Sequence, residues 1–279
     1  MAKTLFRADS GAKVGLGHIS RDLVFAARFA ERFKFDKIEF ACLDLEGNVN
    51  AQIPYPVHIL KSGDASEISN LIINGGFETI VIDNYAIDAD FERALKETAG
   101  AKIIAFDDER KPHFCDVLVA PGVWTSAEDY AGLVPAGCEI LAGFSLVRDE
   151  FYAEREIRRE KIYDYFVCLG GSDVKNATAR VALSLPNTAK IAIATTSANS
   201  NLNSLKALAA SRENISLFVD FAHMARLMNE SEVLHISAST LVSEASVLGA
   251  KFVAYRVAEN QTRIYEYLKK TGVECHDLA

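Results

Sequence analysis

The stretch that decides the fold reads RADSGAKVGLGHISRD, from Arg7 to Asp22. It follows an apolar run, Lys3–Arg7, that predicts a strand, and it leads into an amphipathic run, His18–Phe33, that predicts a helix. Gly15 and Gly17 allow the backbone to turn tightly between the two and to approach a ligand closely. A strand, a glycine turn and a helix in this order are typical of an α/β fold with a parallel sheet.

Short apolar strands alternate with longer amphipathic stretches along the rest of the chain. Further strands are predicted at Lys37–Leu43, Thr79–Ile82, Lys102–Phe106, Asp116–Ala120, Tyr165–Leu169, Lys190–Ala194, Ser216–Val219, Val233–Ile236 and Phe252–Tyr255. Further helices are predicted at Ala65–Ile73, Phe91–Thr98, Asn176–Leu183, Leu202–Ser211, Phe221–Met228, Leu241–Leu248 and Gln261–Lys270. This alternation gives parallel sheets joined by crossover helices.

The chain divides into two similar halves. A charged stretch, Arg148–Lys161, separates them and is typical of an exposed connecting helix. The second half opens like the first, with a strand, a glycine turn and a helix over Phe166–Asn176. We therefore expect two Rossmann-like domains, residues 1–147 and 148–279, whose parallel sheets face each other across a cleft. Ligands of such sheets bind at the carboxyl ends of the strands.

Composition excludes several classes of function. The chain has 279 residues, of which 49% are hydrophobic, and a formal net charge of −8. Such a charge argues against nucleic acid as a partner, and no apolar run approaches the roughly 20 residues that span a bilayer. Met1–Arg7 lacks the apolar core of a secretory signal, so we expect a cytoplasmic protein. We also expect it to be a monomer. The five cysteines form no C-x-x-C pair, which indicates reduced thiols rather than a zinc site.

His18 is the strongest candidate for a catalytic residue. It lies where the first helix begins, and the positive end of the helix dipole disfavours the charged imidazolium. A neutral imidazole can accept a proton from water, and Asp22, one turn further along, is placed to orient the ring. The alternative is that His18 only caps the helix or packs beneath the loop.

The same loop also resembles a dinucleotide-binding fingerprint. Gly15, Gly17 and Ser20 follow its spacing, and Asp44 lies where a ribose-binding acid would follow the next strand. This pattern favours a nicotinamide-dependent dehydrogenase. The third glycine is missing, however, and a histidine occupies the tight turn.

The second half carries the residue types that hold a nucleotide. Gly171 and Ser172 precede a helix, and Ser239 and Thr240 open another, so both helix starts can receive a phosphate. Glu244 lies one turn into the latter helix, where its carboxylate can accept the hydroxyls of a ribose. Asn260 and Gln261 offer amides to a sugar. The alternatives for these residues are turns, helix caps and a favourable charge near a helix start.

Two polar clusters end strands of the first half. Asp83-Asn84-Tyr85 places a tyrosine that can reach a ligand or serve the fold alone. Asp107-Asp108-Glu109 offers oxygen ligands for a divalent cation, but no further ligand is placed by the sequence. We predict neither a metal nor a cofactor.

These segments together resemble the UDP-2,4-diacetamido-2,4,6-trideoxy-β-L-altropyranose hydrolases of pseudaminic acid biosynthesis. The matching pieces are Leu5-Phe6-Arg7 with Asp9-Ser10, Gly15-Leu16-Gly17-His18, Arg21-Asp22-Leu23, Phe40-Ala41-Cys42-Leu43 with Leu45-Glu46-Gly47, Ile53-Pro54-Tyr55-Pro56-Val57, Phe106-Asp107-Asp108-Glu109 with Lys111-Pro112-His113, Tyr130-Ala131-Gly132-Leu133-Val134-Pro135, Gly170-Gly171, Leu227-Met228-Asn229-Glu230-Ser231 and Asn260-Gln261. They cover nearly the whole chain.

The resemblance implies a GT-B fold and cleavage of a sugar–UDP bond by water. We expect inversion, because the reaction would use one base and no enzyme nucleophile, and no metal, because UDP is already a good leaving group. The resemblance implies three catalytic residues: His18 as the base, Tyr85 and Asn260. Residues implied to bind UDP are Gly17, Gly171, Ser172, Ser239, Thr240 and Glu244, and those implied to bind the sugar are Asp9, Arg21 and Gln261. Asn84 departs from the family, which has a histidine at this position. A glycosyltransferase with the same donor and a non-catalytic UDP-sugar-binding protein remain alternatives.

Overall fold

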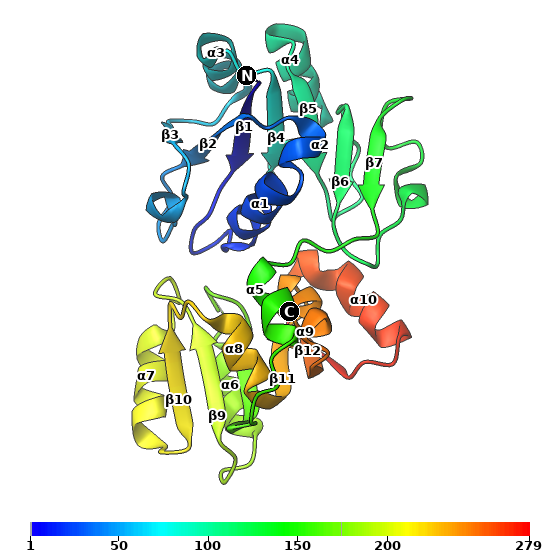
Figure 1. Cartoon of the computed structure of the whole chain (residues 1–279). Coiled ribbons are helices and arrows are strands. Elements are labelled where there is room, and N and C mark those ends of the chain that lie inside the picture. The colour runs from blue at the N-terminus through cyan, green and yellow to red at the C-terminus, as the bar shows by residue number, and fades with distance from the viewer. Residues whose placement is uncertain (1, 174) are drawn as a thin grey trace. The chain divides into compact units, whose positions relative to one another are not determined.

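The computed structural model describes residues 2–173 and 175–279. It divides into two compact units, Met1–Leu146 and Val147–Ala279, each with its own parallel sheet (Figure 1). The parallel α/β organisation expected from the alternation of strands and helices is confirmed in both units.

The sheet of the first unit has the strand order β3-β2-β1-β4-β5-β6-β7, and all its neighbours are parallel. The strands are β1 (Lys3–Ala8), β2 (Lys37–Leu43), β3 (Val57–Leu60), β4 (Thr79–Asp83), β5 (Lys102–Phe106), β6 (Val117–Ala120) and β7 (Glu139–Ala142). The helices are α1 (Gly17–Arg28), α2 (Ala30–Phe33), α3 (Ala65–Gly75) and α4 (Ala89–Ala99), with 3₁₀ turns η1 (Asn50–Gln52) and η2 (Ala127–Tyr130).

The helix expected over His18–Phe33 is divided into α1 and α2. Phe29, between them, adopts φ −107° and ψ 7°, outside the helical range, while its N–H still bonds to the carbonyl oxygen of Phe25. Its ring stacks on Phe25 and Phe33, at centroid distances of 4.7 and 6.1 Å. The helix is therefore interrupted at Phe29, where its ring packs in an aromatic cluster, and the apolar periodicity of the sequence does not show this interruption.

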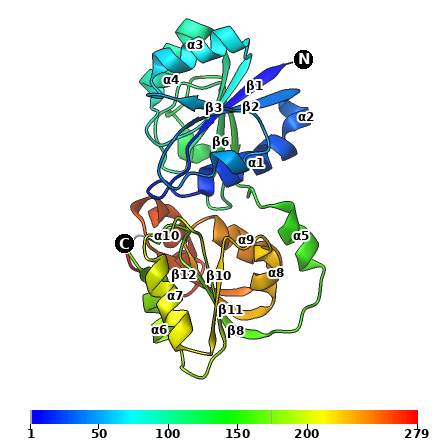
Figure 2. The same cartoon turned by 90° about the vertical axis from the view of Figure 1, so that its left-hand side faces the viewer.

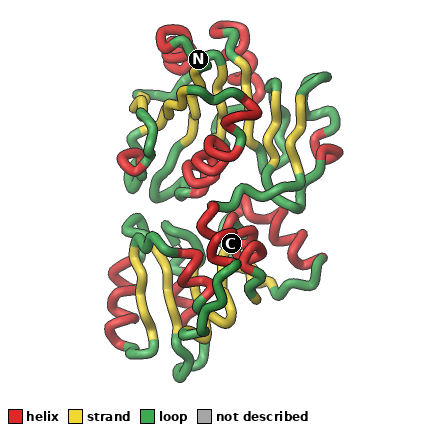
Figure 3. Tube along the Cα trace, in the orientation of Figure 1, coloured by secondary structure: helices red, strands yellow, loops and turns green. Residues whose placement is uncertain are grey.

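Alternate side chains of β1 enter two different cores. Leu5 packs in a core with Ile68 and Ile72 of α3, whereas Phe6 packs in a second core with Phe25 of α1. Successive residues of a strand point to opposite faces, so one apolar strand anchors helices on both sides of the sheet. Figures 2 and 3 show the helices on either side of the strands.

The sheet of the second unit has the order β10-β9-β8-β11-β12-β13, again with parallel neighbours. The strands are β8 (Tyr163–Cys168), β9 (Ile191–Thr195), β10 (Ile215–Val219), β11 (Ser231–Ser237), β12 (Lys251–Arg256) and β13 (Cys275–Asp277). The helices are α5 (Asp149–Arg155), α6 (Ala177–Ser184), α7 (Leu202–Ser211), α8 (Met224–Asn229), α9 (Thr240–Leu248) and α10 (Thr262–Lys270), with the 3₁₀ turn η3 (Glu259–Gln261).

The charged stretch Arg148–Lys161 is helical only in its first half, as α5, and it is not fully exposed as expected. Phe151 is completely buried, and Glu154 is buried and paired with Arg159. Burial of one apolar side chain and one ion pair fixes α5 to the second unit, although the sequence here is dominated by charge.

The strand order of each sheet reverses once, between β1 and β4 in the first unit and between β8 and β11 in the second. Loops that leave adjacent strands at such a point diverge to opposite faces and open a crevice at the carboxyl ends of the strands. Within residues 2–173 and 175–279, no helix combines the length and the apolar content needed to cross a membrane.

Candidate functional site

His18 is the second residue of α1 and is held by a carboxylate from the neighbouring strand. Its Nδ1 lies 2.6 Å from Oδ1 of Asp83, the last residue of β4. The register aligns Ala8 at the end of β1 with Asp83, so the helix that follows β1 starts beside this carboxylate. The expectation that Asp22 orients the ring is therefore wrong: the strand order supplies a partner that the helical spacing does not show.

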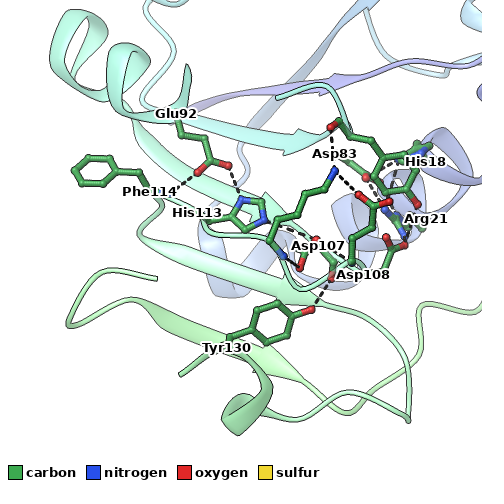
Figure 4. A network of polar contacts seen from close by, with 12 residues as sticks. His18, Arg21, Asp83, Glu92, Asp107, Asp108, His113, Phe114 and Tyr130 are labelled. Atoms are coloured by element: carbon green, nitrogen blue, oxygen red, sulfur yellow. Dashed lines mark hydrogen bonds and ion pairs between the residues drawn. The ribbon is translucent and has the colours of Figure 1, made fainter. Parts of the chain in front are cut away.

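Arg21 fixes Asp83 from the other side. Its Nε donates to Oδ2 at 2.5 Å and its Nη2 to Oδ1 at 2.6 Å, while Nη1 donates to Oδ2 of Asp108 at 2.7 Å (Figure 4). Burial disfavours a charged carboxylate, but Arg21 and His18 outweigh it and hold the pKa of Asp83 well below its usual value. Asp83 is therefore a fixed negative charge at Nδ1 of His18.

Tyr85 completes this group. Its ring meets the His18 ring edge to face, with centroids 4.6 Å apart and an interplanar angle of 77°. Its hydroxyl donates to Oδ2 of Asp108 at 3.1 Å, the oxygen that Arg21 also contacts. The structure thus brings together three residues singled out from the sequence, His18, Arg21 and Tyr85, around the carboxylates of Asp83 and Asp108, which the sequence did not indicate as their partners.

Asp9 and Asn84 form a buried network next to this group. The guanidinium of Arg7 donates to both oxygens of Asp9, at 2.6 and 2.8 Å, and the N–H of Leu43 donates to Oδ1. Nδ2 of Asn84 donates to Oδ2 of Asp9 at 2.8 Å. Asp9 thus ties the ends of β1, β2 and β4 together, and its expected contact with substrate stays a prediction.

A second buried group holds the loop that carries Asp108. Nδ1 of His113 lies 2.7 Å from Oε1 of Glu92 on α4, and the N–H of Phe114 donates to Oε2 of Glu92 (Figure 4). Asp107 accepts from the backbone N–H groups of Glu109 and Lys111. Burial opposes a charge on His113, but the neighbouring carboxylates of Asp107 and Glu92 raise its pKa to about 9. His113 is therefore a cation at neutral pH.

In the second unit, α9 begins at the carboxyl end of β11. Ser239 is its N-cap and accepts a hydrogen bond from the N–H of Leu241, and Thr240 is exposed in the first turn. The Oγ of Ser239 also lies 2.9 Å from that of Ser237. Ser239 and Thr240, two of the three hydroxyl residues predicted to bind UDP, therefore lie at the amino end of a helix, where a phosphate is favoured.

Glu244 is buried one turn further along α9 and is paired with Arg148. Its Oε1 accepts from Nε and Nη2 of Arg148 at 3.1 and 3.0 Å. Burial raises the pKa of Glu244, although Arg148 favours its charged form. The pairing keeps one carboxylate oxygen occupied by protein.

The loop after β8 carries the other residues predicted to bind phosphate. The carbonyl oxygen of Gly171 accepts from Oγ1 of Thr196 at 2.9 Å, and that of Ser172 accepts from the N–H of Ser200. The side chain of Asp173 accepts from the N–H groups of Ala177 and Thr178 at the start of α6. The amino end of α6 is thus already occupied by a carboxylate, which leaves the amino end of α9 as the better place for an anion.

Asn260 and Gln261 lie in η3, directly before α10. Asn260 is exposed, and Oε1 of Gln261 accepts from the N–H of Val257 at 2.8 Å, which fixes the turn. Their roles toward a sugar stay predictions. Asp44, the acid of the dehydrogenase alternative, accepts from Nδ2 of Asn48.

Sequence reasoning missed three partners: Asp83, Asp108 and Arg148. Asp83 ends β4 and Asp108 comes two residues after β5, so both lie at the carboxyl ends of strands, where ligands bind. This position was the sequence signal that could have identified them. Arg148 carried no such signal. In the described part of the chain, no three His, Cys, Asp or Glu side chains are grouped so that they could hold a metal ion.

Comparisons with known proteins agree with this architecture. No family model matches the chain. It is similar to MurG of Acinetobacter baumannii, with a TM-score of 0.59 and 15% identity over 99% of this chain and 86% of that one. It is also similar to a UDP-glucosyltransferase of Polygonum tinctorium, with a TM-score of 0.62 and 9% identity over 99% of this chain and 85% of that one. These likenesses concern the fold and confirm the predicted GT-B class.

One relative is much closer in sequence. The UDP-2,4-diacetamido-2,4,6-trideoxy-β-L-altropyranose hydrolase of Campylobacter jejuni is 47% identical over 274 residues, which cover 98% of both chains. The chain belongs to the family of UDP-2,4-diacetamido-2,4,6-trideoxy-β-L-altropyranose hydrolases.

Proposed function

We propose that this protein hydrolyses UDP-2,4-diacetamido-2,4,6-trideoxy-β-L-altropyranose to UDP and 2,4-diacetamido-2,4,6-trideoxy-L-altrose, in pseudaminic acid biosynthesis. The observation that carries the substrate assignment is the 47% identity with the Campylobacter enzyme over 98% of both chains. The chemistry is supported by the geometry around His18.

His18 is the base that activates water. With Nδ1–H donating to Asp83, the other ring nitrogen, Nε2, carries the lone pair that accepts a proton. The carboxylate of Asp83 holds the ring in this tautomer and stabilises the imidazolium that forms. Tyr85 packs edge to face on the ring and restricts its rotation.

The reaction is a direct displacement. The water oxygen attacks the anomeric carbon as its proton passes to Nε2 of His18. The bond between that carbon and the β-phosphate oxygen breaks, and its electron pair leaves with UDP. A single base without an enzyme nucleophile gives inversion at the anomeric carbon.

UDP leaves readily because its negative charge can be spread and neutralised. Backbone N–H groups at the start of α9, with the hydroxyls of Ser239 and Thr240, stabilise the charge that develops on the β-phosphate. We expect turnover to survive treatment with EDTA, whereas its loss and recovery on adding Mg²⁺ would contradict a metal-independent reaction.

The two units divide the remaining tasks. The second unit holds the nucleotide: Glu244 accepts the ribose hydroxyls, while Gly171 and Ser172 border the diphosphate. Asn260 and Gln261 are assigned to the sugar. In the first unit, the exposed Gly17 allows the backbone to approach the substrate, and Asp9 and Arg21 act on the sugar side.

The test is to incubate the protein with the UDP-sugar in water enriched in ¹⁸O. Proton NMR in the first minutes should show the inverted anomer of the free sugar, and mass spectrometry should find the label in the sugar and not in UDP. Label in UDP would mean attack at phosphorus and would overturn the mechanism. UDP released only after addition of an acceptor would identify a glycosyltransferase instead.

A further inference from the structure

Asp22 is a buried carboxyl group for which the proposed mechanism has no use. It lies on α1, one turn after His18, and its side chain is completely buried. In residues 2–173 and 175–279, neither of its oxygens receives a hydrogen bond from a donor. An ionised carboxylate in such a place would lose its hydration without compensation.

The groups that face Asp22 come from α1, β2 and β4. Arg21, its neighbour on α1, is attractive, but all three guanidinium nitrogens already donate to Asp83 and Asp108. Cys42 of β2 is a completely buried thiol, and burial raises its pKa to about 12, so it contributes no charge. Asp83 of β4 interacts with Asp22 through its negative charge and through a hydrogen bond between the two carboxyl groups, and its own pKa is held well below the usual value.

Asp83 has room for one more donor. An ionised carboxylate offers about four lone-pair positions. His18 Nδ1, Arg21 Nη2 and Arg21 Nε occupy three of them. A protonated Asp22 can fill the fourth, whereas two ionised carboxylates in contact would repel each other.

We propose that Asp22 is held as the neutral carboxylic acid, donates its proton in a hydrogen bond to Asp83, and thereby positions the carboxylate that orients His18. Burial and the negative charge of Asp83 act together to raise the pKa of Asp22 well above its usual range, which agrees with this arrangement. Asp22 is completely buried and acts through Asp83. It is a positioning residue.

The neutral state of Asp22 has a consequence for the base. A hydrogen bond from Asp22 draws electron density away from the side of Asp83 that faces His18. Without it, the negative charge of Asp83 would act more strongly on Nδ1 of His18, and turnover would be lost at a higher pH on the acid side. This part of the inference rests on the proposed role of His18 as the base.

The experiment compares Asp22→Asn, whose amide can still donate to Asp83, with Asp22→Ala, which cannot. An infrared difference spectrum, wild type minus Asp22→Asn, should show the C=O stretch of a protonated carboxyl group at neutral pH. Asp22→Ala should lower kcat by about 10- to 100-fold, as the loss of an outer partner of a catalytic group does. It should also move the acid limb of the kcat/KM profile to higher pH, and Asp22→Asn should restore both.

Absence of the protonated carboxyl band at neutral pH would overturn the inference. So would an Asp22→Ala profile that coincides with that of the wild type. If Asp22→Ala does not fold, the inference is tested by the infrared band and by the kcat/KM profile of Asp22→Asn, which should match that of the wild type. Full turnover in His18→Ala with the band still present would instead refute the proposed role of His18 and leave the carboxyl pair intact.

Discussion

Nδ1 of His18 and Oδ1 of Asp83 lie 2.6 Å apart, although 65 residues separate them in the chain. The first residue begins a helix and the second ends a strand, and only the pairing of β1 with β4 makes them neighbours. This contact defines which ring nitrogen donates and which accepts, and several tests follow from it and from its surroundings.

Replacing His18 by Ala should lower kcat by about 10²–10⁴-fold, the usual value of general base assistance. UDP should still bind, because no residue assigned to the nucleotide in the second unit is altered. Turnover is measured by UDP release, and UDP affinity by calorimetry. A His18→Ala protein that retains its turnover would refute the assignment.

Replacing Asp83 by Asn should reduce both turnover and stability. The amide cannot balance the buried guanidinium of Arg21, and breaking such a buried pair costs about 3–5 kcal/mol. Urea denaturation and kcat are measured together. Asp90→Asn, at an exposed position on α4, is the matched control and should change neither. Equal stability of Asp83→Asn and the control would contradict the buried pairing.

His113 should make stability depend on pH. Its pKa is raised to about 9 from an ordinary value of 6.5, so its contribution is fully present below about pH 6.5 and is lost as the pH rises through about 9. This difference between the folded and unfolded pKa of His113 corresponds to about 3 kcal/mol in the free energy of unfolding. Urea denaturation at about pH 6 and about pH 10 should show a larger decrease for the wild type than for His113→Gln. Parallel decreases in the two proteins would mean that His113 is neutral when folded.

Glu244→Gln should weaken UDP binding by about 10- to 100-fold, the value of a hydrogen bond to a charged group. The loss should be confined to the ribose. Wild type should therefore bind 2′-deoxy-UDP less tightly than UDP, whereas the variant should not distinguish them. Glu232→Gln, at an exposed position of β11, is the control. Full discrimination by Glu244→Gln would place the ribose elsewhere.

Two glycines should respond differently to substitution by alanine. A Cβ at Gly171 would lie 2.9 Å from Cγ2 of Thr196, so Gly171→Ala should lose about 1–3 kcal/mol of stability as well as UDP affinity. A Cβ at Gly17 would meet no heavy atom within 4 Å, so Gly17→Ala should keep its Tm. If substrate approaches the backbone at Gly17, kcat/KM should nevertheless fall. Unchanged kcat/KM would remove Gly17 from the binding residues.

The sequence predicted the interior strands well and missed three strands at sheet edges. Lys37–Leu43 and Lys102–Phe106 have the expected bounds. Each contains a continuous apolar segment, 40–42 and 103–106 respectively, that is buried on both faces of the sheet. β3, β7 and β13 each lie at an edge of a sheet and are partly exposed. Their sequences are short and combine polar with apolar residues, as loops do. They are strands because they pair with a neighbouring strand of the sheet.

The local sequence determined where strands and helices lie and which polar residues follow the strands, because backbone geometry and apolar periodicity act over a few residues. It therefore placed His18, Tyr85, Ser239 and Glu244 at the carboxyl ends of their sheets.

The tertiary structure decided which polar groups meet. Helical spacing favoured Asp22 as the partner of His18. The strand order instead brought Asp83 to Nδ1 of His18, and the oxygens of Asp22 receive no hydrogen bond in the described part of the chain. In the same way it brought Asp108 to Arg21 and Arg148 to Glu244. A hydrogen bond depends on separations of a few ångström, and between distant segments these are fixed only when the sheet is assembled.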